Sequence, residues 1–313
     1  MMNNMSHATK MTGRRLSLVR TLLTVSSTLT MRVLLTFSAL LSLCTFSFAS
    51  SASNVVTPSV KTTIELPLQG LTLEYKASVR LLQVLDDANA SSNMTAGSNV
   101  TNSSSIGYFP LSAQLFDKTN TKANGLNKDI EAQKHHVFKQ LDAFSVEEPE
   151  AKRVKQQLAS FQYLNRVFIE LDRNAVISQS GKNPLLVSRS NLDKTSATQA
   201  QRFSLYLPKR PTSIQLVGAM KESVTMNLIE HGTLNDYLDA LPSGFIGESA
   251  DKSVAYVIQP DGVVQTIQYA YWNEQPVYLA PGAMVFMAFD ALPSEYSTLN
   301  QDIVDLLRNK VGL

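Results

Sequence analysis

The chain has 313 residues, a length that accommodates two modest domains. Its formal net charge is +2, from 28 Lys and Arg against 26 Asp and Glu, but five of the basic residues and none of the acidic ones precede residue 50. The rest of the chain therefore holds 23 basic residues against 26 acidic ones. This balance argues against a nucleic-acid-binding surface, which needs clustered positive charge.

The N-terminal segment has the pattern of a leader. Met31 and Arg32 precede an apolar run over residues 33–48, and a small side chain follows it, as in a secretory signal peptide. We expect a signal peptide over residues 1–49, with Met31 as an alternative start. Because a bilayer span needs about 20 apolar residues, an uncleaved anchor is the weaker alternative. The only cysteine, Cys44, lies in this run, so the exported chain would have no disulfide and no thiolate metal site.

A hairpin, a helix and a loop are predicted after the leader. Residues 62–66 and 71–75 alternate apolar and polar side chains around Gly70, which predicts a half-buried β-hairpin. Residues 79–88, "VRLLQVLDDA", place their apolar side chains near one face and predict a helix. Residues 89–105 are rich in Asn, Ser and Thr and predict a surface loop.

The hydrophobic period becomes helical over residues 128–164. Two apolar stripes, separated by a break at Pro149, predict a hairpin of two helices inserted into the first unit. The strand period returns over residues 166–172, "RVFIELD", and continues through "NPLL". A polar segment over residues 188–201 then ends the unit.

A second unit with the same order of elements follows. Strands are predicted on both sides of the Lys209-Arg210-Pro211 break, the later one ending at Gly218, and "VTMNLI" predicts another strand. "TLNDYLDAL" predicts a short helix capped by Thr233. The order strand, strand, short helix, strands thus occurs twice, which predicts an internal repeat of a β-grasp-like unit.

The C-terminal elements complete this second unit. "VAYVIQ" and "VVQTIQYAYW" flank a turn at residues 260–262 and predict a hairpin. "YWNEQPVYLAPGAMVFMAFD" has the pattern of two apolar strands around a turn at Pro281 and Gly282. Residues 297–313 predict an amphipathic helix with one apolar face.

The expected fold is therefore α+β, with two β-grasp-like domains, a helical-hairpin insertion and a C-terminal amphipathic helix. Without disulfides, its stability must come from hydrophobic cores. The segments are the leader (1–49), an N-terminal domain (53–200) with the insertion at about 128–164, a C-terminal domain (201–290) and the terminal helix (291–313).

Patterns for catalysis and cofactors are missing from the sequence. It contains no phosphate-binding glycine loop, no His-Glu-x-x-His helix, no calcium loop and no Gly-x-Ser-x-Gly elbow. His135 and His136 are adjacent on a predicted helix, so they cannot chelate one metal ion as i, i+4 partners would, and His231 lies at a turn. We expect no catalytic residue, no metal and no cofactor. A carboxylate-pair glycosidase is the alternative that the sequence leaves open.

Several ordered motifs carry a resemblance to a known family. They are "NRVFIELD" with "NPLL", "YLPKRPTSIQLVGAM", "TLNDYLDAL", "YVIQPDGVVQ", "YWNEQPVYLAPGAMVFMAF" and "LNQDIVDLLRNK". Over residues 166–313, and more loosely before them, the chain resembles the GfcC-like capsule and exopolysaccharide biosynthesis family of Gram-negative bacteria. The resemblance implies a periplasmic protein with two β-grasp domains similar to those of outer-membrane polysaccharide export proteins.

The function that this resemblance implies is non-enzymatic. We expect a periplasmic accessory protein in capsule or exopolysaccharide assembly or export that binds the surface polysaccharide or the outer-membrane export machinery. One alternative is a periplasmic polysaccharide-modifying enzyme that uses a carboxylate pair. Another is a subunit or partner of an export channel, whose terminal helix contacts a membrane protein.

Arg166 is the first candidate for a ligand contact. It opens an apolar strand, where a charge must reach a cleft or find a partner, because an unpaired buried charge is costly. Its position also matches an arginine in the resembling family. We expect Arg166 to contact an anionic sugar in the groove between the domains, or else to form a structural ion pair with Asp172 or another acid.

Aromatic and basic residues of the second unit are further candidates. Tyr269, Tyr271 and Trp272 could stack on sugar rings or form sheet core, and for Tyr278 the core is the preferred interpretation. Arg210 could line the junction between the domains or lie in a solvated linker.

Overall fold

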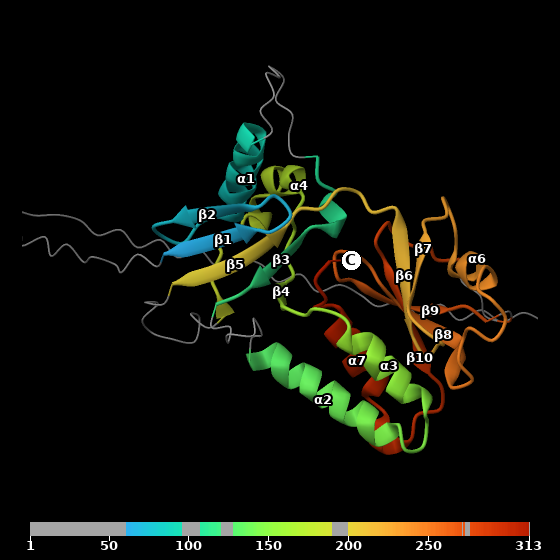
Figure 1. Cartoon of the computed structure of the whole chain (residues 1–313). Helices are drawn as coiled ribbons and strands as arrows, with labels where there is room; N and C mark the ends of the chain where they lie inside the picture. The colour runs from blue at the N-terminus through green and yellow to red at the C-terminus, as the bar shows by residue number, and fades with distance from the viewer. Residues whose placement is uncertain are drawn as a thin grey trace, which may run out of the picture. The chain divides into compact units, whose positions relative to one another are not determined.

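The computed structural model describes residues 61–95, 107–119, 128–189, 200–270, 272 and 276–312. They belong to one compact unit, Val55–Leu313, and the predicted leader lies outside the described residues. Two five-stranded mixed sheets with helices packed on them form the fold, so the predicted α+β class is confirmed (Figure 1). No helix in this part of the chain is long and apolar enough to cross a membrane.

The first sheet has the strand order β2-β1-β5-β3-β4. Its strands are β1 (Thr62–Leu66), β2 (Leu71–Tyr75), β3 (Gln114–Asp117), β4 (Asn165–Val167) and β5 (Gln201–Tyr206). β1 and β2 form the predicted antiparallel hairpin, and Gly70 turns between them with a φ of 65°, which favours glycine. β1 also pairs in parallel with β5, and β3 lies antiparallel between β5 and β4.

The strand pairing differs from the sequence prediction at β5 and β3. The sequence assigns β5 to the second unit, but this strand pairs with β1 and β3 of the first sheet. Hydrophobic periodicity identifies a strand without identifying its neighbours, and the break at residues 209–211 follows a strand that closes the first sheet. β3 is not predicted at all, because its four residues are all buried and show no alternation.

The segment after β4 is also different from its prediction. The strand expected over residues 166–172 ends at Val167, and helix α4 (Arg173–Ser178) and the 3₁₀ helix η2 (Ser180–Lys182) follow instead of a continuing strand. The α4 helix begins because the Asp172 carboxylate accepts a hydrogen bond from the backbone N–H of Asn174 at 2.9 Å.

Helix α1 (Leu81–Thr95) covers the first sheet and is longer than predicted. It includes residues 89–95, which the sequence assigns to the polar loop. Its apolar face is buried against the sheet up to Ala88, and residues 89–95 continue the helix beyond this packing although Asn and Ser have a modest helix propensity. The buried side chains are Leu81, Val84, Leu85 and Ala88.

The second sheet repeats the topology of the first. Its strands are β6 (Ser213–Gly218), β7 (Val224–Asn227), β8 (Ala250–Ile258), β9 (Val264–Gln268) and β10 (Met284–Phe289), in the order β7-β6-β10-β8-β9. A helix again follows the first hairpin: α6 (Leu234–Asp239), which begins with the predicted Thr233 cap in a capping box with Asp236. The internal repeat is thus present as a repeated strand order, and its assignment as β-grasp stays a prediction.

The segment before β10 is not the strand that its apolar residues predict. Among the described residues it forms one β-bridge, between Tyr278 and Thr233, which is isolated and belongs to no ladder. The Tyr278 side chain is 62% exposed, so its preferred assignment to the core is wrong. Pro276 lacks the N–H that a ladder would need, which disfavours pairing here. The predicted turn does form, with a hydrogen bond from the Ala283 N–H to the Ala280 carbonyl.

The predicted helical hairpin is confirmed and packs on the second sheet. Helices α2 (Lys128–Phe144) and α3 (Glu150–Ala159) occur in the connection between β3 and β4, yet their apolar faces share a core with β6, β8 and β10. The terminal helix α7 (Leu299–Leu307), after the 3₁₀ helix η3 (Ser294–Tyr296), completes this core and packs against α2 (Figure 1). Helix α6 covers the opposite face of the sheet.

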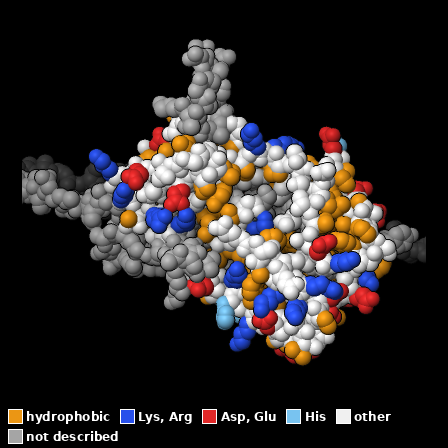
Figure 2. All heavy atoms as spheres, viewed as in Figure 1, with side chains coloured by type: hydrophobic (Ala, Val, Ile, Leu, Met, Phe, Trp, Pro, Cys, Tyr) orange, Lys and Arg blue, Asp and Glu red, His pale blue; other side chains and the backbone are white. Residues whose placement is uncertain are grey.

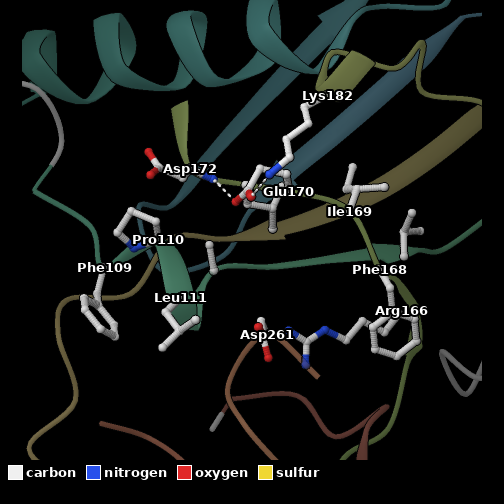
Figure 3. Close-up of a pocket in the computed structure, with 13 residues that line it drawn as sticks. Phe109, Pro110, Leu111, Arg166, Phe168, Ile169, Glu170, Asp172, Lys182 and Asp261 are labelled. Carbon is white, nitrogen blue, oxygen red and sulfur yellow. Dashed lines mark hydrogen bonds and ion pairs between the residues drawn. The ribbon is translucent and has the colours of Figure 1, made fainter. Parts of the chain in front are cut away.

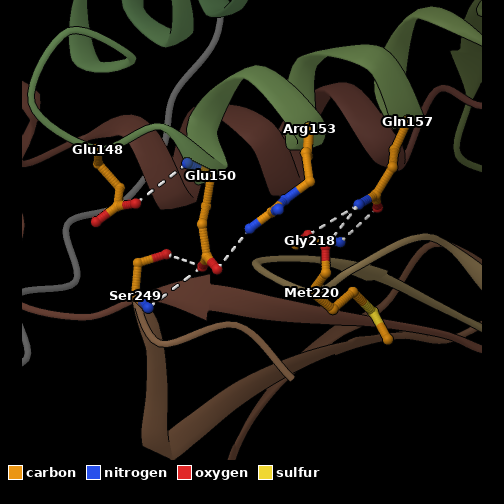
Figure 4. Close-up of polar contacts among 7 residues, drawn as sticks. All are labelled: Glu148, Glu150, Arg153, Gln157, Gly218, Met220 and Ser249. Atoms are coloured by element: carbon orange, nitrogen blue, oxygen red, sulfur yellow. Dashed lines mark hydrogen bonds and ion pairs between the residues drawn. The ribbon is translucent and has the colours of Figure 1, made fainter. Parts of the chain in front are cut away.

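Gln157 of α3 joins the hairpin to β6 through its buried amide group (Figure 4). Its Nε2 donates to the carbonyl of Gly218 at 3.1 Å and to that of Met220 at 3.4 Å, and its Oε1 accepts from the Gly218 N–H at 3.0 Å. These contacts satisfy backbone groups that a helix side chain without polar atoms would leave unpaired.

We expect Gln157→Met to lower the free energy of unfolding by about 2–4 kcal/mol, because the Gly218 N–H and the Met220 carbonyl lose their bonds to the amide, while the Gly218 carbonyl keeps its bond from the Met220 N–H. Urea denaturation measures this change. Gln156→Met, at the neighbouring exposed position, is the control and should change the stability by less than about 0.5 kcal/mol. Equal effects of the two substitutions would contradict this role for Gln157.

Glu150 fixes the start of α3 to the second sheet (Figure 4). Its carboxylate accepts from the Ser249 N–H at 3.2 Å and from the Ser249 hydroxyl, and Arg153 Nη2 donates to it at 2.7 Å. Burial raises the pKa of Glu150, but the bonds from Ser249 and the charge of Arg153 outweigh it, and the pKa lies below its usual 4.5.

A lowered carboxyl pKa stabilises the fold above the usual value, and this contribution disappears as the pH falls through the folded-state pKa. We therefore expect Glu150→Gln to cost about 1–2 kcal/mol at pH 7 and progressively less below pH 4.5. Denaturation curves of both proteins between pH 7 and pH 3 check this. The exposed Glu147→Gln is the control, and a pH-independent cost for Glu150→Gln would contradict the prediction.

Candidate functional site

A cavity of about 620 Å³ lies between segments of both sheets (Figure 3). The 3₁₀ helix η1 (Pro110–Ser112) and the chain from β4 to Asp172 form most of its wall, and Asp261 reaches it from the β8–β9 turn. The volume is in the range of small-molecule sites. The cavity is lined by Phe109, Pro110, Leu111, Ala113, Arg166, Val167, Phe168, Ile169, Glu170, Leu171, Asp172, Lys182 and Asp261.

Arg166 of β4 supplies the buried positive charge of this cavity. Its side chain is 96% buried, since only 4% of the residue is exposed. Nη2 donates to the Pro260 carbonyl at 2.5 Å, whereas the buried Nη1 has no hydrogen-bond partner among the described residues. The guanidinium carbon lies 5.4 Å from the centre of the Phe168 ring. Arg166 of the first sheet thus reaches the β8–β9 turn of the second sheet and keeps one donor without a partner among the described residues, while its predicted contact with a sugar stays a prediction.

Arg166 remains charged despite its burial. Burial lowers its pKa to about 10, with a smaller lowering from Arg308 and an opposing effect from Asp261, so the group remains protonated at neutral pH. The alternative ion pair with Asp172 does not form, because that carboxylate caps α4. Within the described ranges, Arg166 forms no salt bridge with any other acid.

Glu170 and Lys182 form a fixed ion pair in another part of the wall (Figure 3). Lys182 Nζ donates to Glu170 at 2.9 Å, and the backbone N–H of Asp172 donates to the same carboxylate at 3.1 Å. The Lys182 contact, together with the Asp172 N–H, holds the pKa of Glu170 below its usual value. The general acid of a glycosidase needs a raised pKa, whereas the pKa of Glu170 is lowered.

Of the other predicted site residues, Tyr269, Trp272 and Arg210 are not among those that line the cavity. Tyr269 packs against the core of the second sheet and its hydroxyl donates to the Asp251 carbonyl at 2.5 Å, so it belongs to the sheet core. Burial raises the pKa of Tyr269, with a smaller effect of Asp251. Trp272 is 75% exposed, and Tyr271 lies outside the described residues. Arg210 is exposed, but it stacks on Phe109 of the cavity wall at 5.2 Å.

Sequence reasoning did not identify three residues of this region: Phe168, Asp261 and Arg308. Phe168 has the pattern of an ordinary strand residue, and Asp261 that of an ordinary turn residue. Arg308 lies 4.5 Å from the Phe168 ring and donates from Nε to the Gly262 carbonyl at 2.9 Å. These contacts join residues far apart in the chain, so no local pattern indicates them.

Metal and nucleic-acid sites find no support in the described part of the chain. No group of three or more His, Cys, Asp or Glu residues there could hold a metal ion. On the face shown in Figure 2, basic and acidic side chains are interspersed and no broad basic patch appears.

Two comparisons with known proteins bear on the identity of the chain. It is 26% identical over 163 residues to the Uncharacterized protein YjbG of Escherichia coli (strain K12), a match that covers 50% of this chain and 59% of that relative. Residues 222–312, which include β7 to β10, α6 and α7, match the family model for capsule biosynthesis GfcC C-terminal. This match confirms the resemblance described above. Over its C-terminal part, the chain is therefore similar to the capsule biosynthesis GfcC C-terminal family.

Proposed function

We propose that this protein is a non-enzymatic accessory protein of the periplasm that acts in the assembly or export of a capsule or exopolysaccharide. In this proposal, an acidic group of the glycan binds in the cavity beside Arg166. The observation that carries it is the buried guanidinium with an unpartnered Nη1. A buried charge with an unsatisfied donor is costly unless a ligand supplies the acceptor, and arginine binds carboxylate and phosphate groups well. The family's involvement in capsule biosynthesis supports a glycan as the ligand.

The two alternative functions receive less support. A carboxylate-pair enzyme needs a protonated general acid, and Glu170 in the cavity wall is instead held ionised by Lys182. An export-channel subunit that assembles through the apolar face of α7 would need that face exposed, and it is buried within the chain. Glycan binding without catalysis requires neither feature.

Calorimetric titration of the exported chain with a galacturonic acid hexasaccharide tests the binding. Maltohexaose, which has the same length and no charge, is the control ligand. We expect binding of the acidic sugar alone, and a loss of at least about tenfold in affinity in Arg166→Gln. Equal binding of both sugars, or an unchanged affinity of the variant, would contradict the proposal.

A second experiment tests the proposed role in assembly or export of the surface polysaccharide. In the strain that carries the gene, Arg166→Gln at unchanged protein abundance should reduce the surface polysaccharide. Purified protein should also leave the chain length of that polysaccharide unchanged, since the proposal includes no cleavage. Shortened chains would favour the enzyme instead. Recovery of the protein from the cytoplasm alone would contradict the periplasmic location.

A further inference from the structure

Two arginine–phenylalanine stacks flank the cavity. Arg308, after helix α7, lies over the Phe168 ring at 4.5 Å, and Arg210, between β5 and β6, lies over the Phe109 ring at 5.2 Å. Both phenylalanines line the cavity, and Figure 3 shows them at opposite ends of it. Each arginine thus lies against a phenylalanine of the wall, although neither arginine is itself among the lining residues.

Stacking leaves the hydrogen-bonding edge of a guanidinium group available. An aromatic ring contacts the flat face of arginine, so the N–H groups remain directed outward while the plane loses rotational freedom. Arg308 is further fixed by the bond from Nε to Gly262 and has only a long contact of 3.5 Å with Asp305. Arg210 forms no ion pair with a carboxylate in the described ranges. Both side chains are thus preorganised to bind anions.

The charges between the two stacks are mixed. Arg308 lowers the pKa of Arg166, so these two cations repel each other at the Phe168 end, where Asp261 alone among the lining acids affects Arg166. Glu170, Asp172 and Lys182 contribute polar groups elsewhere in the wall. Carboxylates accept hydrogen bonds from sugar hydroxyls, whereas they repel a second anion. This order of charges suits a ligand with anionic groups at both ends and hydroxyl groups between them.

We infer that the cavity binds an internal segment of an acidic polysaccharide that carries at least two anionic groups separated by neutral parts of the sugar chain. One anionic group contacts Arg166 and Arg308, another contacts Arg210, and hydroxyl groups between them contact the carboxylates of the wall. This inference rests on the proposed function, and it adds that the ligand is a polymer segment and not a single acidic sugar. Arg308 and Arg210 determine this preference for length.

Titrations with galacturonic acid and with its hexasaccharide test the inference. We expect Arg308→Gln and Arg210→Gln each to weaken hexasaccharide binding about tenfold and monosaccharide binding less than about twofold. Both variants should also reduce the salt dependence of hexasaccharide binding. Arg202→Gln removes the same charge at an exposed ion pair with Glu65, away from the cavity lining, and is the matched control.

The outcomes separate this inference from the function on which it rests. If Arg166→Gln abolishes binding while Arg308→Gln and Arg210→Gln affect neither ligand, the inference is overturned and the proposed function remains. If the unmodified protein binds neither ligand, both are overturned. Thermal melting accompanies each titration, and the exposed Arg210 provides a variant whose folding the substitution should not affect.

Discussion

Deletion of residues 297–313 is expected to unfold the second half of the chain. The five side chains of α7 that face the protein are each 0% exposed, and they share a core with α2, α3 and three strands of the second sheet. Full burial of one such side chain contributes about 1.5–3 kcal/mol, so their sum is comparable with the whole stability of a domain, about 5–15 kcal/mol. The buried residues are Leu299, Ile303, Val304, Leu306 and Leu307.

The tail after α7 adds hydrogen bonds to the first half of the chain. The Gly312 N–H donates to Gln114 of β3 at 3.0 Å, and the Leu164 N–H donates to the Asn309 carbonyl at 3.0 Å. Deletion therefore removes contacts to both sheets. If α7 served only to assemble a ring of subunits, its deletion would abolish assembly and leave the domains folded.

Circular dichroism and thermal melting of the truncated chain measure this effect. We expect loss of the cooperative transition at room temperature. Leu306→Ala, a milder change, should cost about 2–5 kcal/mol, while Gln301→Ala on the exposed side of the same helix should cost almost nothing. A truncated chain that melts cooperatively near the original temperature would show that α7 does not hold the fold together.

Arg166→Met is expected to abolish binding of the acidic sugar without loss of stability. Methionine fills a similar volume and carries no charge, so the desolvation cost of the unpartnered Nη1 disappears and offsets the loss of the bond from Nη2 to the Pro260 carbonyl. The free energy of unfolding should remain within about 1 kcal/mol of its original value or rise, whereas breaking a buried ion pair typically costs about 3–5 kcal/mol. Binding is thus expected to be lost while the free energy of unfolding is retained or raised.

Guanidinium denaturation and calorimetry of the same preparation check both parts. Arg202→Met provides the comparison, since it removes an exposed arginine paired with Glu65 and should change stability by about 0–1 kcal/mol and binding not at all. A loss of several kcal/mol in Arg166→Met would assign Arg166 a structural role. Retained binding would contradict its role in the cavity.

The sequence predicted correctly those features that depend on residues close together in the chain. The Thr233 cap, the break at Pro149 and the apolar face of α7 each depend on neighbours within a few residues, and each prediction is confirmed. The pairing of β5 with β1 depends on residues more than a hundred positions away, and periodicity contains no such information. Propensity also failed for residues 89–95, which continue α1 although their Asn and Ser residues favour caps and loops.

The sequence could indicate a residue of the cavity only if that residue differed in chemical type from its neighbours in the chain. Arg166 could be found because a charge at the start of an apolar strand needs an explanation. Phe168 and Asp261 could not, since each is ordinary in a strand or a turn and becomes significant only when the two sheets come together. Tyr269 looked equally suited to a site, and its bond to the Asp251 carbonyl places it in the core instead.

The helical hairpin between β3 and β4 determines when the cavity can form. The chain leaves the first sheet after β3, packs α2 and α3 on a core that is complete only with β10 and α7, and then returns to form β4 with Arg166. The backbone N–H of Arg166 donates to Asn309 near the C-terminus at 3.1 Å. A chain that emerges N-terminus first therefore cannot complete the surroundings of Arg166 before its C-terminal residues are available, and we expect incomplete chains to lack the proposed glycan binding.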